Sequence, residues 1–496
     1  MAREKKTAEE GTASSPDNPD IFHVSSEIYP FSKSGGLADV VGILPQSLRE
    51  LGLKPCVITP LYGRISTSQY RINLAYENCP VGYPWPEITA DIYRTDFNGV
   101  PVFFIERGEY FDRRHYYCTH KGDYFDNCER FIFFCRAAVA LMQKMGASPR
   151  IVHAHDWHAA LCNAYIHFKK SASSFWENTK TVFTIHNLAF QGRFSSRLFW
   201  DSGLPFHAWN MDGVEFYNSF NLLKAGIAYS DLITTVSPTY AAEILTPEFG
   251  CGMEGLLAKN RDKIWGILNG ADYSIWDPIK DKYLGFNYSL KDLSGKKKCK
   301  KELLAKFCLP EKLADQPVFG FIGRLRKQKG IDMVLEAAEE LVADGAGLIV
   351  LGEGKDIYES RLMELVEKYP RNIAGIVGYT EEMAHKIQAG SDMFLMPSRY
   401  EPCGLTQMYS LRYGTLPIGS AVGGLKDTII PYPDKEANGF IFREFTTRSF
   451  VECIRQAINI FKKEPETWKE IQRRAMNADF SWKKSAGIYG QAYGKL

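Results

Sequence analysis

The sequence lacks both a dominant charge and a long apolar stretch. Its 496 residues carry 60 lysines and arginines against 58 aspartates and glutamates, which leaves a formal net charge of +2. No broad field would gather nucleic acid or an anionic membrane surface, so an anionic ligand has to be bound by local groups. No run approaches the roughly eighteen apolar residues of a membrane helix. We therefore expect neither a nucleic-acid partner nor a membrane partner.

The sequence also lacks paired cysteines. Its eleven cysteines are scattered, and no C-x-x-C pair or regular spacing points to a zinc knuckle or a disulfide framework. Such thiols are typical of reducing compartments. Residues 1–19 are polar, contain no apolar core of a signal peptide, and carry the acidic residues that transit peptides avoid. We predict a disordered tail there and a cytoplasmic protein, with a plastid location as the alternative for a processed plant or algal form.

One stretch does concentrate charge of one sign. Residues 295–304 read GKKKCKKELL. A nucleic-acid patch is one interpretation, but the lysines stand among helix-forming residues, and such runs are usually the solvated face of a helix. We predict a solvated helix face.

Short apolar runs rich in β-branched residues alternate with stretches of helical period. Strand-like examples are KPCVITPL, KTVFTIHN and GLIVLGEG, and a helical one is GIDMVLEAAEELVADGA. This alternation predicts an α/β fold with buried parallel strands, and the length favours two or more domains. We expect a first domain over 20–265, a connection rich in Gly, Asn, Asp and Pro over 266–295, a second domain over 296–475, and a C-terminal helix over 476–496 that packs back on the first domain.

Parallel sheets bind ligands at the carboxyl ends of their strands. The first such place reads SKSGGLADV, with Lys33, Gly35 and Gly36 between a strand and a helix. Glycine lets a ligand approach the backbone, and the amides that open the helix form an anion site beside the lysine. An ordinary tight turn is the alternative, because neither a Walker loop nor G-x-G-x-x-G is present. G-G-L returns at Gly423 and Gly424, which predicts a second glycine-rich opening.

Polar residues also follow two later strands of the first half. HAHDWH contains three histidines, but no carboxylate or cysteine at metal-ligand spacing follows, so we expect no metal there. Asp156 can accept hydrogen bonds from sugar hydroxyls, and Trp157 offers an apolar face. His186 ends the strand of KTVFTIHN, where a satisfied loop histidine is the alternative.

Two strand ends of the second half carry charge. FIGRLRKQKG places Arg324 and Lys329 before a helix, where the two cations suit a diphosphate and would stabilise a departing phosphate oxygen. A solvated charge cluster is the alternative. PSRYEPCGLTQM places Glu401 at a second strand end, where a helix cap is the alternative. The helix start that follows offers amides and a hydroxyl to a phosphate, and its residues are Cys403, Gly404, Leu405 and Thr406.

Six motifs occur in order between about residue 20 and residue 430. They are KSGGLADVVGILPQSL, HAHDWHA, TIHNLAFQG, NGADYSIWDP, GRLRKQKG and SRYEPCGLTQMYSLRYGTLPIGSAVGGLKDT. Together with the C-terminal helix, they resemble the family of bacterial glycogen synthases and plant starch synthases. The motifs are long, so the resemblance is specific.

The resemblance implies a GT-B glycosyltransferase, with two Rossmann-like domains facing each other across a deep cleft. The first domain is implied to be on the acceptor side and the second to bind the nucleotide sugar. The implied reaction transfers glucose from ADP-glucose to the non-reducing 4-hydroxyl of an α-1,4-glucan such as glycogen, starch or a maltooligosaccharide. The anomeric configuration is retained and ADP is released, with no cofactor and no metal.

The resemblance also implies roles for single residues. Arg324 and Lys329 neutralise the diphosphate, and Glu401 supports the transferred glucose, for which we favour electrostatic support with front-side attack over a covalent bond. Asp156 and His186 line the sugar-transfer region. The implied donor-binding residues are Lys33, Gly35, Gly36, Asn269, Tyr379 at the adenine, Cys403, Gly404, Leu405 and Thr406.

One position departs from many other retaining GT-B enzymes. They carry a second glutamate, eight positions beyond the first, that holds the ribose, and here that position is Tyr409. This counts against a sucrose-synthase-like enzyme. Three rivals stay open: a GT-B transferase with UDP-glucose or another acceptor, a catalytically silent glucan-binding scaffold, and a glucan phosphorylase with pyridoxal phosphate. The presence of Lys33, Arg324, Lys329 and Glu401 argues against the silent scaffold.

Overall fold

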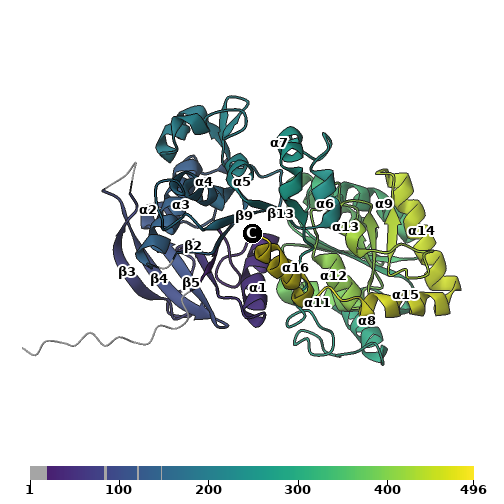
Figure 1. Cartoon of the computed structure of the whole chain (residues 1–496). Coiled ribbons are helices and arrows are strands. Elements are labelled where there is room, and N and C mark those ends of the chain that lie inside the picture. The colour runs from purple at the N-terminus through teal and green to yellow at the C-terminus, as the bar shows by residue number, and fades with distance from the viewer. Residues whose placement is uncertain (1–18, 83–86, 120–121, 147) are drawn as a thin grey trace, which may run out of the picture. The chain divides into compact units, whose positions relative to one another are not determined.

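The computed structural model of the chain describes residues 19–82, 87–119, 122–146 and 148–496. The predicted disordered tail lies outside the described residues except for residue 19. The described chain divides into two compact units, whose elements Figure 1 labels. The first unit holds residues 19–183 and 191–231, and the second holds residues 184–190 and 232–495. The domain bounds expected from the sequence stay predictions.

The first unit is built on a mainly parallel sheet. Its central strands are buried along their whole length, as continuous apolar runs predict. Two strands add an antiparallel edge. The order across the sheet is β9-β8-β1-β2-β5-β4-β3. The strands are β1 (Ile21–Val24), β2 (Pro55–Pro60), β3 (Asn73–Pro80), β4 (Thr89–Phe97), β5 (Val100–Glu106), β8 (Ile151–His155) and β9 (Lys180–Ile185).

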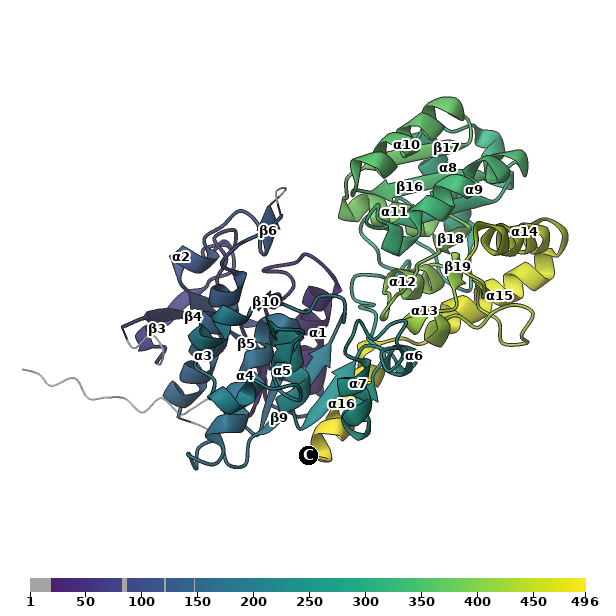
Figure 2. The same cartoon turned by 90° about the horizontal axis from the view of Figure 1, so that it is seen from above.

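Helices cover both faces of this sheet. The connection from β1 through α1 to β2 runs one way along the sheet, and that from β8 through α4 to β9 runs the other way. Because such crossovers are right-handed, α1 and α4 lie on opposite faces, as Figure 2 shows. The direction changes between β1 and β8, which is the switch point of the sheet. The helices are α1 (Gly36–Glu50), α2 (Gly108–Phe111), α3 (Asn127–Lys144), α4 (Asp156–Lys169) and α5 (Leu222–Tyr229).

A small antiparallel sheet between α4 and α5 completes the first unit. Its strand order is β10-β12-β11, and two short 3-10 helices connect β10 to β11. A two-stranded ribbon lies before α3. These elements are β6 (Cys118–Thr119), β7 (Gly122–Asp123), β10 (Arg193–Ser195), η1 (Ser196–Ser202), η2 (Phe206–Ala208), β11 (Glu215–Phe216) and β12 (Ser219–Asn221).

The second unit contains a fully parallel sheet in the strand order β17-β16-β15-β18-β19-β20. This is the Rossmann order 3-2-1-4-5-6, with its switch point between β15 and β18. A short parallel pair, β13 and β14, belongs to the same unit. The strands are β13 (Leu232–Thr235), β14 (Ile264–Gly266), β15 (Val318–Ile322), β16 (Gly347–Gly352), β17 (Ile373–Val377), β18 (Met393–Met396), β19 (Leu416–Ser420) and β20 (Phe440–Phe442).

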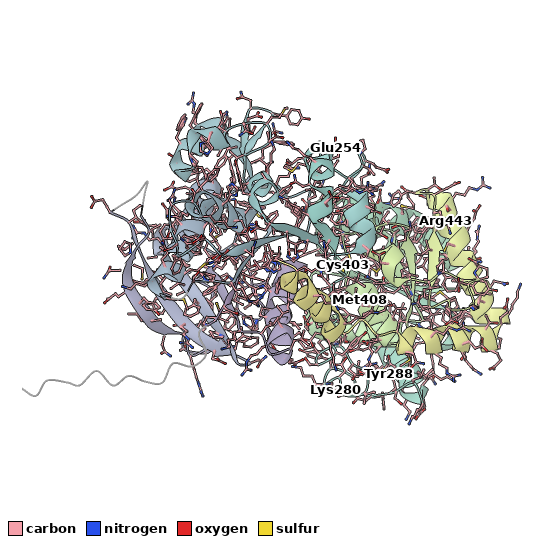
Figure 3. The ribbon with its side chains drawn as sticks, in the orientation of Figure 1. Glu254, Lys280, Tyr288, Cys403, Met408 and Arg443 are labelled. Carbon is pink, nitrogen blue, oxygen red and sulfur yellow. The ribbon has the colours of Figure 1, made fainter. Side chains whose placement is uncertain are left out.

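Helices flank this sheet, and a core that runs from Phe319 through Phe450 to Ala475 joins sheet and helices. Met408, which Figure 3 labels, is a buried residue of α12. The α-helices are α6 (Pro238–Glu243), α7 (Glu254–Lys259), α8 (Ser294–Lys306), α9 (Ile331–Ala343), α10 (Asp356–Lys368), α11 (Glu381–Gly390), α12 (Thr406–Arg412), α13 (Gly423–Thr428), α14 (Thr447–Lys463), α15 (Pro465–Asn477) and α16 (Trp482–Gly494). The 3-10 helices are η3 (Arg261–Lys263), η4 (Glu311–Asp315) and η5 (Lys327–Lys329).

The α/β class predicted from the sequence is confirmed by these two parallel sheets. In the part of the chain that the structure describes, we find no helix with the length and apolar content that a membrane span would need. The last helix, α16, returns to the end of β14, where the Ser485 hydroxyl donates to the Leu268 carbonyl at 2.6 Å. Tyr489 of the same helix lies beside the hydroxyls of Thr184 and Thr234, two residues that the sequence analysis assigns to the first domain.

The lysine run that opens α8 is only half a solvated face. Lys297 and Lys298 are exposed, but Lys296 and Lys300 are each 6% exposed. The Lys296 ammonium donates to the carbonyls of Ala389 and Ser391 at 3.0 and 2.9 Å, which lie at the carboxyl end of α11. The prediction of a solvated face is wrong for Lys296, because a cation that satisfies carbonyls at a helix end is stable when buried. It is also wrong for Lys300, whose ammonium lies 2.7 Å from Asp392 Oδ2 and donates to the Gln316 carbonyl at 2.6 Å.

Candidate active site

The residues predicted to carry chemistry fall into two sets, one in each unit. In the first unit, the Lys33 loop follows β1 and Asp156 follows β8, at the switch point of that sheet. In the second unit, Lys329 follows β15 and Glu401 follows β18, again at the switch point. His186 belongs to the second unit. Both sheets therefore bring predicted residues to the place where parallel sheets bind ligands.

A buried carboxylate that the sequence analysis did not single out holds the Lys33 loop. Glu27 is 3% exposed and accepts hydrogen bonds from the Ser34 N–H, from the Ser34 hydroxyl at 2.6 Å and from the Tyr117 hydroxyl at 2.7 Å. Burial raises the pKa of Glu27, and these bonds with one from the Gly35 N–H counteract it. The amides of Ser34 and Gly35, which the sequence analysis offered to an anion, therefore already bind the protein's own carboxylate. The sequence signal that could have identified Glu27 is the polar run that follows β1 in HVSSE.

Lys33 lies across the first turn of α1. Its ammonium nitrogen is 2.7 Å from Asp39 Oδ1 and 5.4 Å from the centre of the Tyr29 ring. The lysine side chain is 38% exposed, so an anion can reach it from solvent. Partly exposed ion pairs contribute little to stability. Lys33 can therefore exchange Asp39 for a phosphate at small cost. Gly36 opens α1 beside it.

Asp156 has an unusual backbone. It is the first residue of α4, it is 8% exposed, and its φ angle is +56°. The left-handed region costs an L-residue about 1 to 2 kcal/mol, although aspartate tolerates it better than most residues. Strain of this kind persists where the surroundings fix it and is frequent at functional sites. The backbone conformation of Asp156 thus supports its selection as a candidate site residue. No sequence pattern could have predicted this conformation.

The Trp157 ring is closed to a ligand. It is 8% exposed, and a Cβ at Gly192 would come within 2.4 Å of the ring, so the glycine backbone lies directly against it. The rings of His158 and Phe131 pack at 3.9 and 4.9 Å. The prediction that Trp157 offers an apolar face to a sugar is wrong, because neighbouring residues already cover the ring.

Three buried histidines of β1 and β8 lie close together, with ligand nitrogens all within 4.8 Å of one another. The angles between their rings are 28° for His153 and His155, 20° for His23 and His155, and 44° for His23 and His153. Burial lowers the pKa of His23 to about 3, and His23 Nδ1 lies 3.1 Å from His155 Nε2. This geometry favours hydrogen-bonded neutral imidazoles, and the expected absence of a metal stays a prediction.

The second unit holds an ion pair at its switch point. Lys329 Nζ lies 2.5 Å from Glu401 Oε2, and the Ser398 hydroxyl donates to the same oxygen at 3.0 Å. Glu401 is 5% exposed, whereas the Lys329 side chain is 28% exposed. A carboxylate with two fixed partners and little water has one orientation and a weakly screened charge. The sequence places both residues at strand ends, and the structure brings them together.

Backbone packing fixes the Glu401 loop. Gly423 has a φ angle of +41°, and a Cβ there would come within 2.0 Å of the Glu401 carbonyl oxygen. A Cβ at Gly424 would come equally close to the Cys403 carbonyl oxygen. The Gly424 N–H donates to the Glu401 carbonyl at 3.1 Å. The prediction of a second opening for a ligand is wrong here, because the protein's own backbone occupies the space beside Gly423 and Gly424.

The residues from Cys403 to Thr406 form the turn into α12. Gly404 has a φ angle of +71°, and the Gln407 amide donates to the carbonyls of Cys403 and Gly404, both at 3.0 Å. Burial raises the pKa of the Cys403 thiol, which therefore stays neutral. Leu405 and Thr406 are partly exposed at the start of the helix, and the Thr406 hydroxyl lies 3.6 Å from the Met396 sulfur. Figure 3 labels Cys403 in this turn.

Asn269 lies beside this turn. Its N–H donates to the Cys403 sulfur, and the residue is 5% exposed. Within the described residues, its side-chain oxygen Oδ1 is buried and has no hydrogen-bond partner. A buried acceptor without a partner costs free energy, so a ligand hydroxyl there would gain a ready bond.

His186 is joined to the Glu401 loop through its neighbour. Asn187 makes a side-chain hydrogen bond with Tyr400, the residue before Glu401. Burial lowers the pKa of His186 to about 3, so its imidazole is neutral. A neutral imidazole has one donor and one acceptor nitrogen, which suits a sugar hydroxyl.

Arg324 and Tyr379 are more exposed. Arg324 follows β15 and its side chain faces solvent. Tyr379 follows β17, two strands from β15, and is 52% exposed, with its hydroxyl 3.2 Å from Glu381 Oε2. The structure therefore places Tyr379 at a distance from the Lys329 and Glu401 pair along the same edge of the sheet.

Tyr409, the position of the missing second glutamate, is part of an aromatic stack. Its ring lies parallel to Trp276 at 4.2 Å, and His385 covers the Trp276 ring at 3.7 Å. Tyr409 is 7% exposed. A buried, stacked ring of this kind fixes the 269–277 segment beside α12 rather than binding a ribose through a carboxylate.

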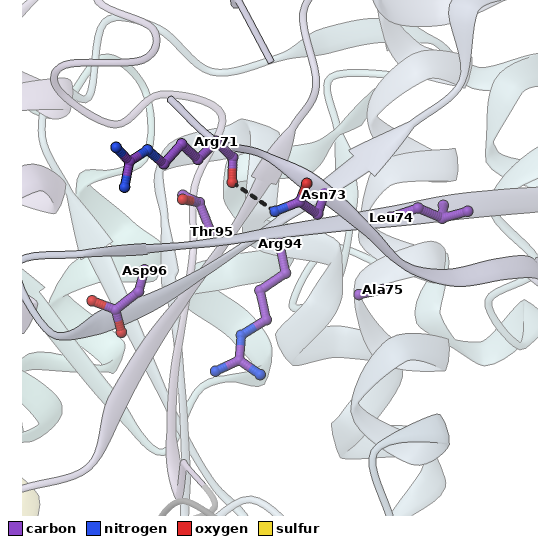
Figure 4. Close-up of a pocket in the computed structure, with 7 residues that line it drawn as sticks. All are labelled: Arg71, Asn73, Leu74, Ala75, Arg94, Thr95 and Asp96. Atoms are coloured by element: carbon purple, nitrogen blue, oxygen red, sulfur yellow. Dashed lines mark hydrogen bonds between the residues drawn. The ribbon is translucent and has the colours of Figure 1, made fainter. Parts of the chain in front are cut away.

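A hollow in the first unit contains none of these residues. It lies on the edge strands β3 and β4 and has Arg71, Arg94 and Asp96 among its lining residues, as Figure 4 shows. Its lining residues Asn73, Leu74 and Ala75 are exposed, and the Asn73 amide donates to the Arg71 carbonyl at 3.1 Å. It offers no convergent set of groups for the predicted chemistry.

The sequence matches two family models. Residues 20–259 match the starch synthase catalytic domain, and residues 310–475 match the glycosyl transferases of group 1. The chain is 41% identical over 491 residues to the glycogen synthase of Mannheimia succiniciproducens, which covers 96% of this chain and all of that protein. It is 39% identical to the glycogen synthase of Thermodesulfovibrio yellowstonii, over 95% of this chain and 96% of that protein.

Solved structures agree with these relatives. The catalytic domain of starch synthase IV from Arabidopsis thaliana, bound to ADP and acarbose, superimposes with a TM-score of 0.89 at 30% identity, covering 96% of this chain and 98% of that one. Sucrose-phosphate synthase from Thermosynechococcus elongatus has a TM-score of 0.60 at 17% identity, with coverage of 97% and 99%, which supports the fold alone. The fold is therefore GT-B, as the resemblance implied.

Proposed function

The chain belongs to the family of glycogen and starch synthases, and we propose that it transfers glucose from ADP-glucose to the non-reducing 4-hydroxyl of an α-1,4-glucan. The proposal is supported by similarity to glycogen synthases along nearly the whole chain. The single observation that carries the chemistry is the Lys329 and Glu401 pair, held at the switch point of a Rossmann sheet. The anomeric configuration is retained, and ADP leaves.

The leaving group needs positive charge. Arg324 and Lys329 both follow β15, so a diphosphate at this strand end would receive one forked guanidinium and one ammonium. The amide of Leu405 and the hydroxyl of Thr406 add donors at the start of α12. As the bond between glucose and phosphate lengthens, negative charge grows on the phosphate oxygen, and these donors stabilise it.

Glu401 acts on the glucose that is being transferred. The transition state carries positive charge on the glucose ring, as in glycoside hydrolysis. A carboxylate that is 5% exposed and held by Ser398 and Lys329 supports this charge in a weakly screened environment. Lys329 therefore has two tasks, since it orients Glu401 and faces the diphosphate. The Asn269 side-chain oxygen accepts a hydrogen bond from a hydroxyl of ADP-glucose, and the Tyr379 ring packs against the adenine.

The first unit and His186 contribute the remaining contacts. We assign Lys33, Gly35 and Gly36 to the donor, with Glu27 holding their loop in place. Asp156 and the neutral His186 hydrogen-bond to hydroxyls of the transferred glucose. We propose that no divalent metal takes part, because two fixed cations supply the charge that magnesium supplies in other transferases. The eleven cysteines, which show no disulfide spacing, support a cytoplasmic location.

The proposal is tested by transfer of radiolabelled glucose to glycogen by the purified chain. We expect incorporation from ADP-glucose, weaker incorporation from UDP-glucose, and an unchanged rate after treatment with a chelator. Preference for UDP-glucose would favour the rival hypothesis of a UDP-glucose-dependent transferase. No incorporation from either donor would favour the hypothesis of a catalytically silent scaffold. An absorbance band of pyridoxal phosphate would indicate a phosphorylase. A rate lost on chelation and restored by a divalent ion would refute the metal-free reaction.

A further inference from the structure

The loops that carry Lys329 and Glu401 are bonded to each other next to this ion pair. The Gln328 side-chain amide donates to the Tyr400 carbonyl at 2.7 Å, and the Arg399 N–H donates to the Gln328 carbonyl at 2.9 Å. Gln328 directly precedes Lys329, and Tyr400 directly precedes Glu401. The two hydrogen bonds run in opposite directions, so they fix the separation of the two backbones as well as their alignment.

The Arg399 guanidinium adds two further bonds across the same gap. Its Nε donates to the Lys327 carbonyl at 3.1 Å, and its Nη2 donates to Asp332 Oδ2 at 2.6 Å. Its Cζ lies 4.6 Å from the centre of the Phe445 ring, which supports the guanidinium from one side. One planar guanidinium thus holds the chain on both sides of Lys329, a task for which a single ammonium has the wrong shape.

The backbone beside Lys329 is closely packed and anchored. Gly330 has a φ angle of +71°, and a Cβ there would come within 1.8 Å of the Pro397 carbonyl oxygen. The helix α9 begins directly afterwards, and its residues Ile331 and Val334 are fully buried in the core of the second unit. Arg399 therefore ties the loop after β18 to the start of a helix that is itself fixed in the core.

A purely structural ion pair is the alternative for Arg399. Its side chain is 35% exposed and that of Asp332 is 17% exposed, and pairs near the surface contribute at most about 1 kcal/mol to folding. All of the bonds described above join residues within three positions of Lys329 or Glu401. Stability alone does not require them to gather around the ion pair, whereas exact placement of two reacting side chains does.

We propose that Arg399 is a positioning residue, which sets the separation between the Lys329 ammonium and the Glu401 carboxylate. The inference rests on the proposed function, in which Lys329 faces the leaving diphosphate and Glu401 supports the transferred glucose. Those two parts of the donor move apart as their bond breaks. The groups that face them must keep their spacing, because a misplacement of about 1 Å can lower the rate about 100-fold.

The first test is Arg399→Gln in the full chain, which removes the guanidinium and its charge. We expect kcat for transfer from ADP-glucose to glycogen to fall about tenfold, or about 1.4 kcal/mol. The KM for both substrates should stay at the wild-type value, because the alignment matters in the transition state. Arg399→Lys keeps the charge without the planar donors, so it should restore less than about half of the lost rate.

The second test repeats Arg399→Gln in a chain that already carries Lys329→Ala. Without the ammonium there is no separation for Arg399 to set, so the residual kcat should fall by less than about twofold. A structural ion pair would cost the same factor in both backgrounds. A tenfold loss in both backgrounds would therefore overturn the inference, and so would an unchanged kcat or a defect confined to KM in the folded single variant.

Arg455→Gln is the matched control. Arg455 pairs with Glu340 of α9 at 2.8 Å in the same unit, so the same chemical change is made at the same helix. It should leave kcat and both KM values unchanged. Thermal melting checks that each variant folds. If Arg399→Gln does not fold, Asp332→Asn takes its place, because it removes the charge that Arg399 binds and should give the same dependence on Lys329.

Acetylation of lysines in the chain without substrates gives a readout that needs no glucose transfer. In Arg399→Gln, we expect Lys329 to be acetylated faster than in the wild type, because its contact with Glu401 loosens. Lys368, which pairs with Glu339 on the surface, is the internal reference. An unchanged ratio of Lys329 to Lys368 acetylation would overturn the inference. A wild-type chain without transfer activity would refute the proposed function, and this ratio would still decide whether Arg399 sets the pair.

Discussion

Glu401→Gln removes a buried negative charge and keeps the shape of the side chain. A unit positive charge about 4 Å from a carboxylate interacts with it by about 4 kcal/mol at an effective dielectric constant of about 20. Lys329 lies 2.5 Å away and offsets part of this attraction. We therefore expect the glutamine variant to lose about 3 kcal/mol of transition-state stabilisation, which lowers kcat at least about 100-fold.

Steady-state transfer from ADP-glucose to glycogen measures this loss. The effect should fall on kcat, because the charge on the sugar develops in the transition state and is absent from the bound donor. The KM for ADP-glucose should change little. Glutamine still accepts the hydrogen bond from Ser398, so the free energy of unfolding should fall by no more than about 2 kcal/mol in urea titrations.

Glu339→Gln provides the control. Glu339 forms a pair with Lys368 at 2.7 Å, but both side chains are more than half exposed, so water already screens their charges. The same chemical change there should leave kcat and urea stability unaltered. If folded Glu401→Gln turned over at close to the wild-type rate, or if its whole defect lay in KM, Glu401 would have no role in supporting charge on the sugar.

Three other changes probe the supports of the site. Glu27→Gln places an amide NH₂ among the donors of the Lys33 loop and should raise the KM for ADP-glucose about tenfold with a smaller effect on kcat; an unchanged KM would contradict this. Burial alone would raise the pKa of Asp281 and lower that of His385, but the hydrogen bond between them, at 2.7 Å, helps to reverse both shifts. The pair therefore stabilises the folded state fully only between pH 3.8 and pH 6.5, the ordinary pKa values of the two groups. Asp281→Asn should therefore cost most at pH 5, about 3 kcal/mol, and less at pH 8; equal losses would argue against the pair. Gly423→Ala should destabilise by at least about 2 kcal/mol and impair turnover, whereas Gly487→Ala in α16, where a Cβ meets open space, should stabilise slightly.

Much of the fold and many site positions follow from local sequence. Buried strands read as continuous apolar runs, and the residue after each run lies at a strand end, so local pattern is enough to place Lys33, Asp156, Arg324 and Lys329. Glu401 is placed in the same way. The two switch points then follow from strand order, which explains why the predicted residues gather there.

The supports of the site depend on contacts between distant residues. Glu27 matters because the chain returns to bring Ser34 and Tyr117 to its carboxylate. Lys296 is buried because the end of α11 offers it carbonyls about ninety residues away. No local pattern distinguishes Lys296 from its exposed neighbour Lys297. For the same reason the covering of Trp157 by Gly192 could not be read from HAHDWH.

The two G-G-L motifs limit what a glycine pair can indicate. Glycine at a strand end means that something approaches the backbone closely, but the residue type does not say what approaches. At Gly423 and Gly424 the approaching groups are the carbonyls of Glu401 and Cys403. We therefore expect this pair to influence catalysis only through the position of the Glu401 loop. A side chain at Gly423 would move the carboxylate before it touched a substrate, so its effect on kcat should follow its effect on Glu401.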